Sequence, residues 1–258
     1  MRGVVLFLMI FPFFSVFGQK EFVDQSNSWF SLTGNHRLNE RWGIHSDFQY
    51  RRSDFLNERL QVLGRIGVEY YTSNSGEVTL GYAWSRFYPY GLQPAASVMD
   101  ENRFWQQFSI RSDYGRLRLQ HRYRLEQRFL RKWLENEDGD SYLGKTIVRY
   151  RIRYRLQFLI PINRQKMSDK TWFINASDEV VLGFGKGVEK NVLDQNRCYL
   201  GLGYRFDSKL NLQAGYQNQY VIKKDAVQIE RNHILQISAF LNLDFRKKEP
   251  ELNPLAKF

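Results

Sequence analysis

Segments in which apolar and polar residues alternate constrain the fold of this chain more than any other feature. The clearest is residues 148–158, where valine, tyrosine, isoleucine, leucine and phenylalanine alternate mostly with arginine. Successive side chains of a β-strand point to opposite faces, so this segment has one apolar face and one face of arginines. A tilted strand needs roughly 9–11 residues to cross a bilayer. Repeated around a closed sheet, the pattern predicts a barrel with an apolar outer wall and a polar lumen.

The same alternation marks eleven candidate strands along the chain. They are residues 28–38, 42–52, 59–71, 77–87, 102–112, 116–129, 146–160, 171–182, 195–206, 210–220 and 232–245. Short turns mostly alternate with longer polar links, as in outer-membrane barrels, whose single chains in bacteria have even strand numbers. We therefore expect an all-β fold, an antiparallel transmembrane β-barrel of twelve strands, with ten as the alternative. A short strand within residues 20–27 would supply the twelfth. Trp29 and other aromatic residues near strand ends would form the interfacial girdles.

A soluble, lipocalin-like barrel with its faces reversed is the alternative to a membrane barrel. In that fold the apolar residues would fill the core and the arginines would face water. Candidate strands of this length exceed the five or six residues typical of soluble sheets. The chain is also 16% aromatic, and so many large rings would overfill a small barrel. Both features favour the membrane barrel.

The first residues have the pattern of a secretory signal peptide. Met1 and Arg2 precede an almost continuously apolar run over residues 4–17, which is too short to span a bilayer comfortably. We expect cleavage between Gly18 and Gln19, a barrel over residues 19–245, and a short charged tail over residues 246–258. No later run of about 18 apolar residues occurs, which excludes a helical membrane protein. The predicted location is the bacterial outer membrane, with its lipids and the barrel-insertion machinery as partners.

Strand parity places a strongly basic wall inside the barrel. The candidate wall residues are Arg116, Arg118, Arg122, Arg124, Arg128, Arg149, Arg151, Arg153 and Arg155, on two strands that we expect to pair. The principal lumen acids are Glu69, Glu126 and Glu179. Rings of arginine build anion pores, so one hypothesis is a small anion-biased, porin-like pore or a site for an anionic solute. The alternative is a closed structural barrel whose arginines pair with these carboxylates.

Enzymatic activity is the third hypothesis and the sequence gives it little support. His36, His121 and His233 project outward by parity, and outward serines such as Ser46 lie on strands not obviously adjacent to them. A lipid hydrolase or acyltransferase would need a serine within hydrogen-bond reach of one histidine. We therefore expect no catalytic residue, metal or cofactor. The net charge of +11 does not indicate a nucleic-acid partner, because the arginines face inward in an exported chain.

Four segments also resemble a known family of Bacteroidetes-type proteins. They are residues 101–107, 121–129, 196–204 and 232–235, of which the most specific is the run from His121 to Phe129. These segments are similar to the uncharacterised family catalogued as domain of unknown function 2490. The resemblance implies an outer-membrane β-barrel without an established activity. One departure is that Phe245 is followed by the charged tail, whereas outer-membrane barrels commonly end on an aromatic residue of the last strand.

Overall fold

The computed structural model describes residues 20–73, 75–91, 97–185, 188, 191–223 and 225–246. The predicted signal peptide and tail residues 247–258 lie outside these ranges. The described residues form twelve strands and no helix. The strands are β1 (Glu21–Arg37), β2 (Trp42–Ser53), β3 (Glu58–Tyr71), β4 (Gly76–Phe87), β5 (Met99–Tyr114), β6 (Leu117–Glu135), β7 (Ser141–Leu143), β8 (Ile147–Pro161), β9 (Thr171–Phe184), β10 (Leu193–Arg205), β11 (Leu210–Ile222) and β12 (Gln228–Leu241).

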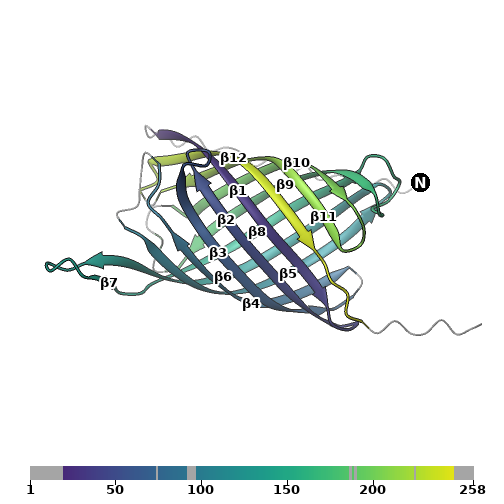
Figure 1. The fold of residues 1–258 in the computed structure, drawn as a ribbon, viewed down its shortest axis with the longest axis horizontal. Coiled ribbons are helices and arrows are strands. Elements are labelled where there is room, and N and C mark those ends of the chain that lie inside the picture. The colour runs from purple at the N-terminus through teal and green to yellow at the C-terminus, as the bar shows by residue number, and fades with distance from the viewer. Residues whose placement is uncertain are drawn as a thin grey trace, which may run out of the picture.

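All of these strands except β7 close into a barrel (Figure 1). Consecutive barrel strands pair antiparallel, while β1 and β12 close the ring in parallel from Glu21 opposite Gln228 to Thr33 opposite Phe240. The expected twelve-stranded, purely antiparallel barrel is therefore wrong on both points. Eleven strands that alternate up and down leave the first and last pointing the same way, so their closing pair has to be parallel. The parallel seam is therefore a direct consequence of the odd strand number.

The eleven predicted strands correspond to the eleven barrel strands, with shifts at their ends. Residues 20–27 hold no separate strand, because residues 21–27 begin the 17-residue β1. The additional strand, β7, pairs only with residues 133–135 at the end of β6, and this hairpin projects beyond the barrel (Figure 1). Three residues are too few to show a period-two pattern, which is why the sequence did not predict β7.

The two ends of the barrel differ in their connections. At the end that we call the short-turn end, side chains of turn residues cap the backbone: Asn39 Oδ1 accepts the N–H groups of Arg41 and Trp42 at 2.9 Å, and Asp207 Oδ1 accepts those of Lys209 and Leu210 at 2.8 Å. Such side-chain caps favour tight turns. The opposite end, which we call the long-loop end, carries the β6–β7 hairpin and the link from β4 to β5.

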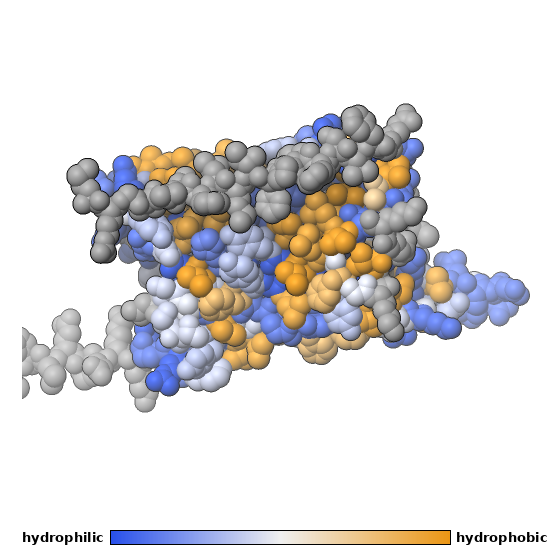
Figure 2. Space-filling model, turned by 180° about the vertical axis from the view of Figure 1, so that it is seen from behind, coloured by the Kyte–Doolittle hydropathy of each residue, from blue (hydrophilic) through white to orange (hydrophobic). Residues whose placement is uncertain are grey.

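The barrel wall has an apolar outer face and a polar inner face. Ile66, Leu80 and Leu200 point outward and are 58%, 59% and 60% exposed, and apolar side chains cover much of the wall in Figure 2. Glu101 and Glu126 point inward and are completely buried. The predicted assignment of faces is confirmed for these positions. Among the described residues, no helix is long and apolar enough to cross a membrane.

Trp29 is an exception to the predicted aromatic girdles. Its side chain points into the lumen and is 7% exposed, whereas Trp42, Trp84 and Trp172 point outward and are exposed. Proximity to a strand end suggested a girdle position, but the odd-numbered residues of this part of β1 face inward. The girdle prediction for Trp29 is therefore wrong.

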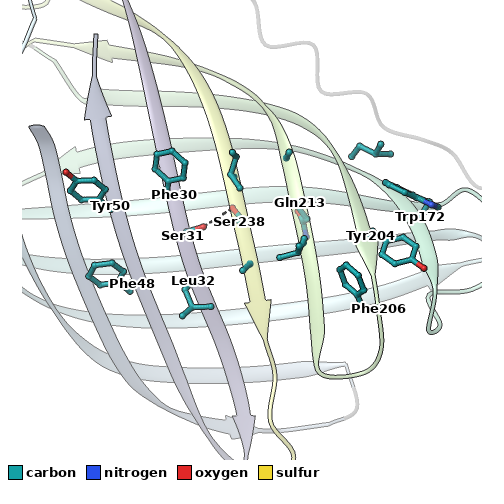
Figure 3. A pocket seen from close by; sticks show the side chains of 15 residues that line it. Phe30, Ser31, Leu32, Phe48, Tyr50, Trp172, Tyr204, Phe206, Gln213 and Ser238 are labelled. Atoms are coloured by element: carbon teal, nitrogen blue, oxygen red, sulfur yellow. Dashed lines mark hydrogen bonds between the residues drawn. The ribbon is translucent and has the colours of Figure 1, made fainter. Parts of the chain in front are cut away.

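A hollow on the outer face lies over the parallel seam (Figure 3). Its volume is about 820 Å³, and it is lined by Phe30 and Leu32 of β1 and, across the seam, by Ile237 and Ala239 of β12. Aromatic side chains, including Phe48 and Tyr204, flank it (Figure 3). Its lining is almost entirely apolar apart from Ser31, Gln213 and Ser238; the Ser31 hydroxyl donates to Ser238 Oγ at 2.8 Å.

Candidate functional site

The pairing of β6 with β8 brings the predicted basic wall together. Their register places Arg122 opposite Arg155, Arg124 opposite Arg153 and Arg128 opposite Arg149. The predicted pairing of these two strands is confirmed. Like charges opposite one another on a sheet are unfavourable, so the arginines of this wall need carboxylates within reach.

Three buried glutamates supply most of that negative charge. Glu101 on β5 binds the Arg128 fork with two hydrogen bonds, Nε–Oε1 at 2.7 Å and Nη2–Oε2 at 2.6 Å, and it also pairs with Arg103. Glu126 Oε1 accepts from Arg103 at 3.1 Å and from Arg153 at 2.9 Å. These links join β5, β6 and β8 into one chain of charge-assisted hydrogen bonds.

Glu179 on β9 continues this chain. Its Oε2 atom accepts from Arg153 at 2.5 Å and from Arg197 at 3.4 Å, while Oε1 accepts from Arg122. The Arg122–Glu179 pair skips a strand, because β8 lies between β6 and β9. We call the set Glu101, Arg103, Arg122, Glu126, Arg128, Arg153, Glu179 and Arg197 the ion-pair network. The network ties the wall residues across the lumen-facing surface of five strands, β5, β6, β8, β9 and β10.

Other predicted wall residues lie outside this network. Arg116 lies exposed in the turn after β5 and donates to the Ile162 carbonyl at 2.7 Å, and Arg118 pairs with Asp113 at 2.7 Å, also at the short-turn end. Arg151 pairs with Asp194 at 2.5 Å. Arg149 lines a chamber at the long-loop end.

Glu69 is buried but lies apart from the ion-pair network. The Tyr71 hydroxyl donates to Glu69 Oε2 at 2.5 Å, and His45 Nδ1 lies 3.7 Å from Oε1. It therefore neutralises none of the arginines on β6 and β8 by direct contact.

Arg51, Arg124 and Arg155 face inward and have no carboxylate within ion-pairing distance in the part of the chain that the structure describes. Arg124 donates to Gln107 Oε1 at 3.0 and 2.5 Å and lies 4.6 Å from the centre of the Trp105 ring. Arg155 donates to Gln157 Oε1 at 3.0 Å. Amide oxygens and aromatic faces stabilise a guanidinium less than a carboxylate does.

Large aromatic side chains fill the lumen beside the ion-pair network. Trp105 lies over Gly67 of β3 and Gly81 of β4, and a Cβ atom on Gly81 would be 2.4 Å from Trp105 Cζ2. His45 contacts the same indole ring at a centroid distance of 5.5 Å. Phe173 lies against Gly203 in a similar way and is almost completely buried. The glycines give the rings room to lie flat against the inner wall.

A chamber of about 590 Å³ opens between the ion-pair network and the long-loop end of the lumen. Arg103, Arg128, Arg153 and Arg197 of the network belong to its lining. Its other charged lining residues are Arg51, Arg65, Arg149, Arg151, Asp194, Lys223, Asp225 and Glu230. Cations outnumber carboxylates in this lining, so the chamber has a positive potential.

The loop residue Tyr90 closes part of the chamber wall. Its hydroxyl donates to Glu230 Oε2 at 3.1 Å. Burial raises the pKa of Tyr90 above its ordinary value, and the nearby Glu230 carboxylate adds to the shift. The phenol therefore stays a neutral hydrogen-bond donor.

Strand parity also places three residues inside the lumen that the predicted site did not include. They are Glu101 and Arg103 of β5 and Arg197 of β10, which face inward by simple alternation. Asp194 could not be found in this way, because the register of β10 with β9 shifts between Leu193 and Gln195. That bulge turns Asp194 inward, where it pairs with Arg151.

One outward histidine does contact a serine, which the sequence analysis did not expect. His36 Nε2 lies 2.9 Å from Ser46 Oγ, and His36 Nδ1 accepts the backbone N–H of Leu243 at 3.3 Å. A neutral imidazole that accepts at Nδ1 carries its proton on Nε2, so it donates to the serine and has no lone pair for the serine proton. This polarity is opposite to that of a serine nucleophile and its base.

The other outward histidines have different partners. His121 contacts the Tyr154 hydroxyl at 2.9 Å, and His233 contacts the Tyr216 hydroxyl at 2.6 Å. Across the described ranges, no group of three histidine, cysteine, aspartate or glutamate side chains could hold a metal ion.

The fold and the lumen define a closed β-barrel with a buried, salt-bridged polar interior. The family model described as a protein of unknown function (DUF2490) matches residues 26–230. The chain belongs to this family, and the resemblance found in the sequence is confirmed. No curated protein and no solved structure matches the chain.

Proposed function

We propose that this protein is a structural β-barrel of the bacterial outer membrane whose lumen is closed to ions. The observation that carries the proposal is the two-faced wall, with exposed apolar side chains outside and ion-paired, buried side chains inside. The predicted signal peptide supports export. Outer-membrane lipid and the barrel-insertion machinery are the partners that this location requires.

The outer face supports a lipid environment. Large exposed apolar patches on a soluble monomer are unfavourable and mark sites of protein or membrane contact. Here exposed apolar residues occur on every strand of the barrel, and the hollow over the seam is apolar enough for acyl chains (Figure 3). A closed barrel also satisfies all its backbone hydrogen bonds between strands, which lipid requires.

The inner face supports a closed lumen. Glu101, Glu126 and Glu179 each bind more than one arginine, and together they engage Arg122, Arg128 and Arg153 at the centre of the basic wall. Trp105 and Phe173 are almost completely buried inside the barrel and fill further space in the lumen. A conducting anion filter instead needs cationic groups that face water.

The anion-biased pore remains the second candidate function. Arg51, Arg124 and Arg155 favour it, because their charges have no carboxylate partner within the described residues. A lipid-modifying enzyme has less support, since the His36–Ser46 pair has the wrong hydrogen-bond polarity.

Quenching of tryptophan fluorescence tests the two-faced wall. We would compare a variant retaining only Trp84, which is outward, with a variant retaining only Trp105, which is inward. In liposomes, brominated lipid is expected to quench Trp84, and aqueous iodide is expected to leave Trp105 unaffected. Absence of lipid quenching at Trp84 would contradict the membrane location. Iodide quenching at Trp105 would contradict the closed lumen.

A further inference from the structure

Arg51 is a buried cation that has no counter-ion among the residues that the structure describes. Its side chain is 7% exposed and lines the chamber at the long-loop end. It donates to Gln61 Oε1 at 2.7 Å and to Gln49 Oε1 at 2.6 Å, and both acceptors are neutral amides. Guanidinium groups stay protonated in proteins, and a buried charge without a partner is costly. The site is therefore incomplete without a negative group.

A second arginine lies beside Arg51 on the same indole ring. The Arg51 guanidinium carbon lies 3.7 Å from the centre of the Trp29 ring, and that of Arg197 lies 5.4 Å from it. Arg197 has only a long contact of 3.4 Å to Glu179 and a hydrogen bond to the Gln195 amide. The two strands that carry these arginines, β2 and β10, are separated by β1, β12 and β11 in the ring. The Trp29 ring thus brings two cations from non-neighbouring strands near one point.

The chamber has apolar surface next to this cationic point. Leu60, Leu63, Phe87, Met99 and Val221 belong to its lining. Its volume of about 590 Å³ lies within the roughly 300–1,000 Å³ of ordinary small-molecule sites. A fully hydrated inorganic ion would leave this apolar part of the lining unused.

We propose that the chamber binds an anionic amphiphile, with its phosphate or carboxylate group between Arg51 and Arg197 and its apolar part against this lining. Two carboxylates of the chamber are engaged by other groups: Asp194 by Arg151, and Glu230 by Lys223 and Tyr90. This binding site rests on the proposed function of a closed barrel and extends it. The ion-pair network closes the end of the chamber opposite the long-loop end. A free small molecule and a lipid headgroup offer the same chemistry.

Isothermal titration of the purified barrel in a nonionic detergent tests the proposal. The probes are hexyl phosphate and hexanoate, with inorganic phosphate and hexylammonium as comparisons. Hexyl phosphate or hexanoate is expected to bind at least about tenfold more tightly than inorganic phosphate, because burial of each methylene is favourable. Hexylammonium is expected not to bind. Equal binding of hexylammonium, or no binding of either anionic amphiphile, would overturn the proposal.

The Arg51→Gln variant locates the site, and Arg155→Gln is its matched control. Arg155 is also an inward arginine without a carboxylate partner among the described residues, but it does not line the chamber. Arg51→Gln is expected to weaken binding at least about tenfold, the effect of losing a hydrogen bond to a charged group. Arg155→Gln is expected to change it less than about twofold. Equal weakening by both variants would show that the positive potential of the whole lumen attracts the anion, and it would overturn the proposed binding site.

Two further measurements keep the result interpretable. Heat-modifiable gel migration checks that each variant folds, and Arg197→Gln replaces Arg51→Gln if the latter does not. Vesicles that contain an anionic lipid, compared with neutral vesicles, distinguish a lipid headgroup from a free ligand: weaker hexyl phosphate binding in the anionic vesicles identifies lipid as the competing occupant. Ion conduction would disprove the closed lumen but would leave the titration to decide on the chamber, so the two failures are distinguishable.

Discussion

Glu126 shows how one carboxylate can decide the energetics of an arginine-rich strand. It lies on β6 between inward arginines, is completely buried, and accepts hydrogen bonds from Arg103 and Arg153. Burying an ion pair gives little net stability, but removal of one partner leaves an uncompensated charge in a low dielectric. The same reasoning applies to Glu101 and Glu179, which also bind more than one arginine.

Glu126→Gln is predicted to lower the free energy of unfolding by about 3 kcal/mol, the lower end of the range for breaking a buried pair. The effect is at the lower end because Arg103 keeps Glu101 and Arg153 keeps Glu179. Denaturant unfolding in detergent micelles measures it. Asp113→Asn is the control, since the Asp113–Arg118 pair is solvent-exposed and such pairs contribute about 0–1 kcal/mol. Equal effects of the two substitutions would show that water reaches Glu126.

Side-chain parity predicted most of the lumen at the level of single residues. Arg122, Arg124 and Arg153 face inward as the alternation indicates, as do Glu126 and Glu179. It failed where a local feature overrides alternation, as at the bulge that turns Asp194 inward. The ion-pair partner of each arginine could not be predicted, because it depends on which strands meet across the closed ring.

Glycines on neighbouring strands have a structural role at the level of elements. Gly67 of β3 pairs directly with Gly81 of β4, and Trp105 from β5 lies over both. A Cβ atom on Gly81 would lie 2.4 Å from the indole and 2.5 Å from the Ile66 carbonyl oxygen. The strand pair therefore makes room for the large indole ring of Trp105. Aromatic cover of a glycine is a known way of stabilising sheets.

Gly81→Ala is predicted to destabilise the barrel by about 1–3 kcal/mol, the usual cost of overpacking. Thermal or denaturant unfolding in micelles measures the change. Gly64→Ala on the adjacent strand is a matched control, because a Cβ atom there meets nothing within 4 Å. An unchanged midpoint for Gly81→Ala would contradict the close approach of Trp105.

The sequence predicted the positions of all eleven barrel strands, but the expected strand number was twelve. All eleven barrel strands show the expected alternation, and an even-number rule led to the expectation of twelve. The rule failed because closure needs only that the first and last strands can pair, and parallel pairing of β1 with β12 satisfies this. Hydrogen bonds between Asn27 and Asn232 and between Ser31 and Ser238 connect the seam on its inner side.

On the scale of the whole molecule, the barrel is divided into layers along its axis. The aromatic rings and the ion-pair network lie within the lumen, and the basic chamber lies between the network and the long-loop end. Exposed apolar side chains occur on every strand of the barrel and cover much of the face seen in Figure 2, and the hollow lies over the seam (Figure 3). Sequence predicted the two faces of the wall. It could not predict whether the lumen was open, because that depends on how the side chains fill it.

Conductance of the purified barrel in a planar bilayer tests the closed lumen most directly. The account predicts no discrete current steps from residues 19–258 under a salt gradient. A double variant, Trp105→Ala with Glu126→Ala, removes one large ring and one central carboxylate and is predicted to give steps, which shows that insertion has occurred. Anion-selective steps from the unaltered protein would contradict the account and would make the inward arginines a filter.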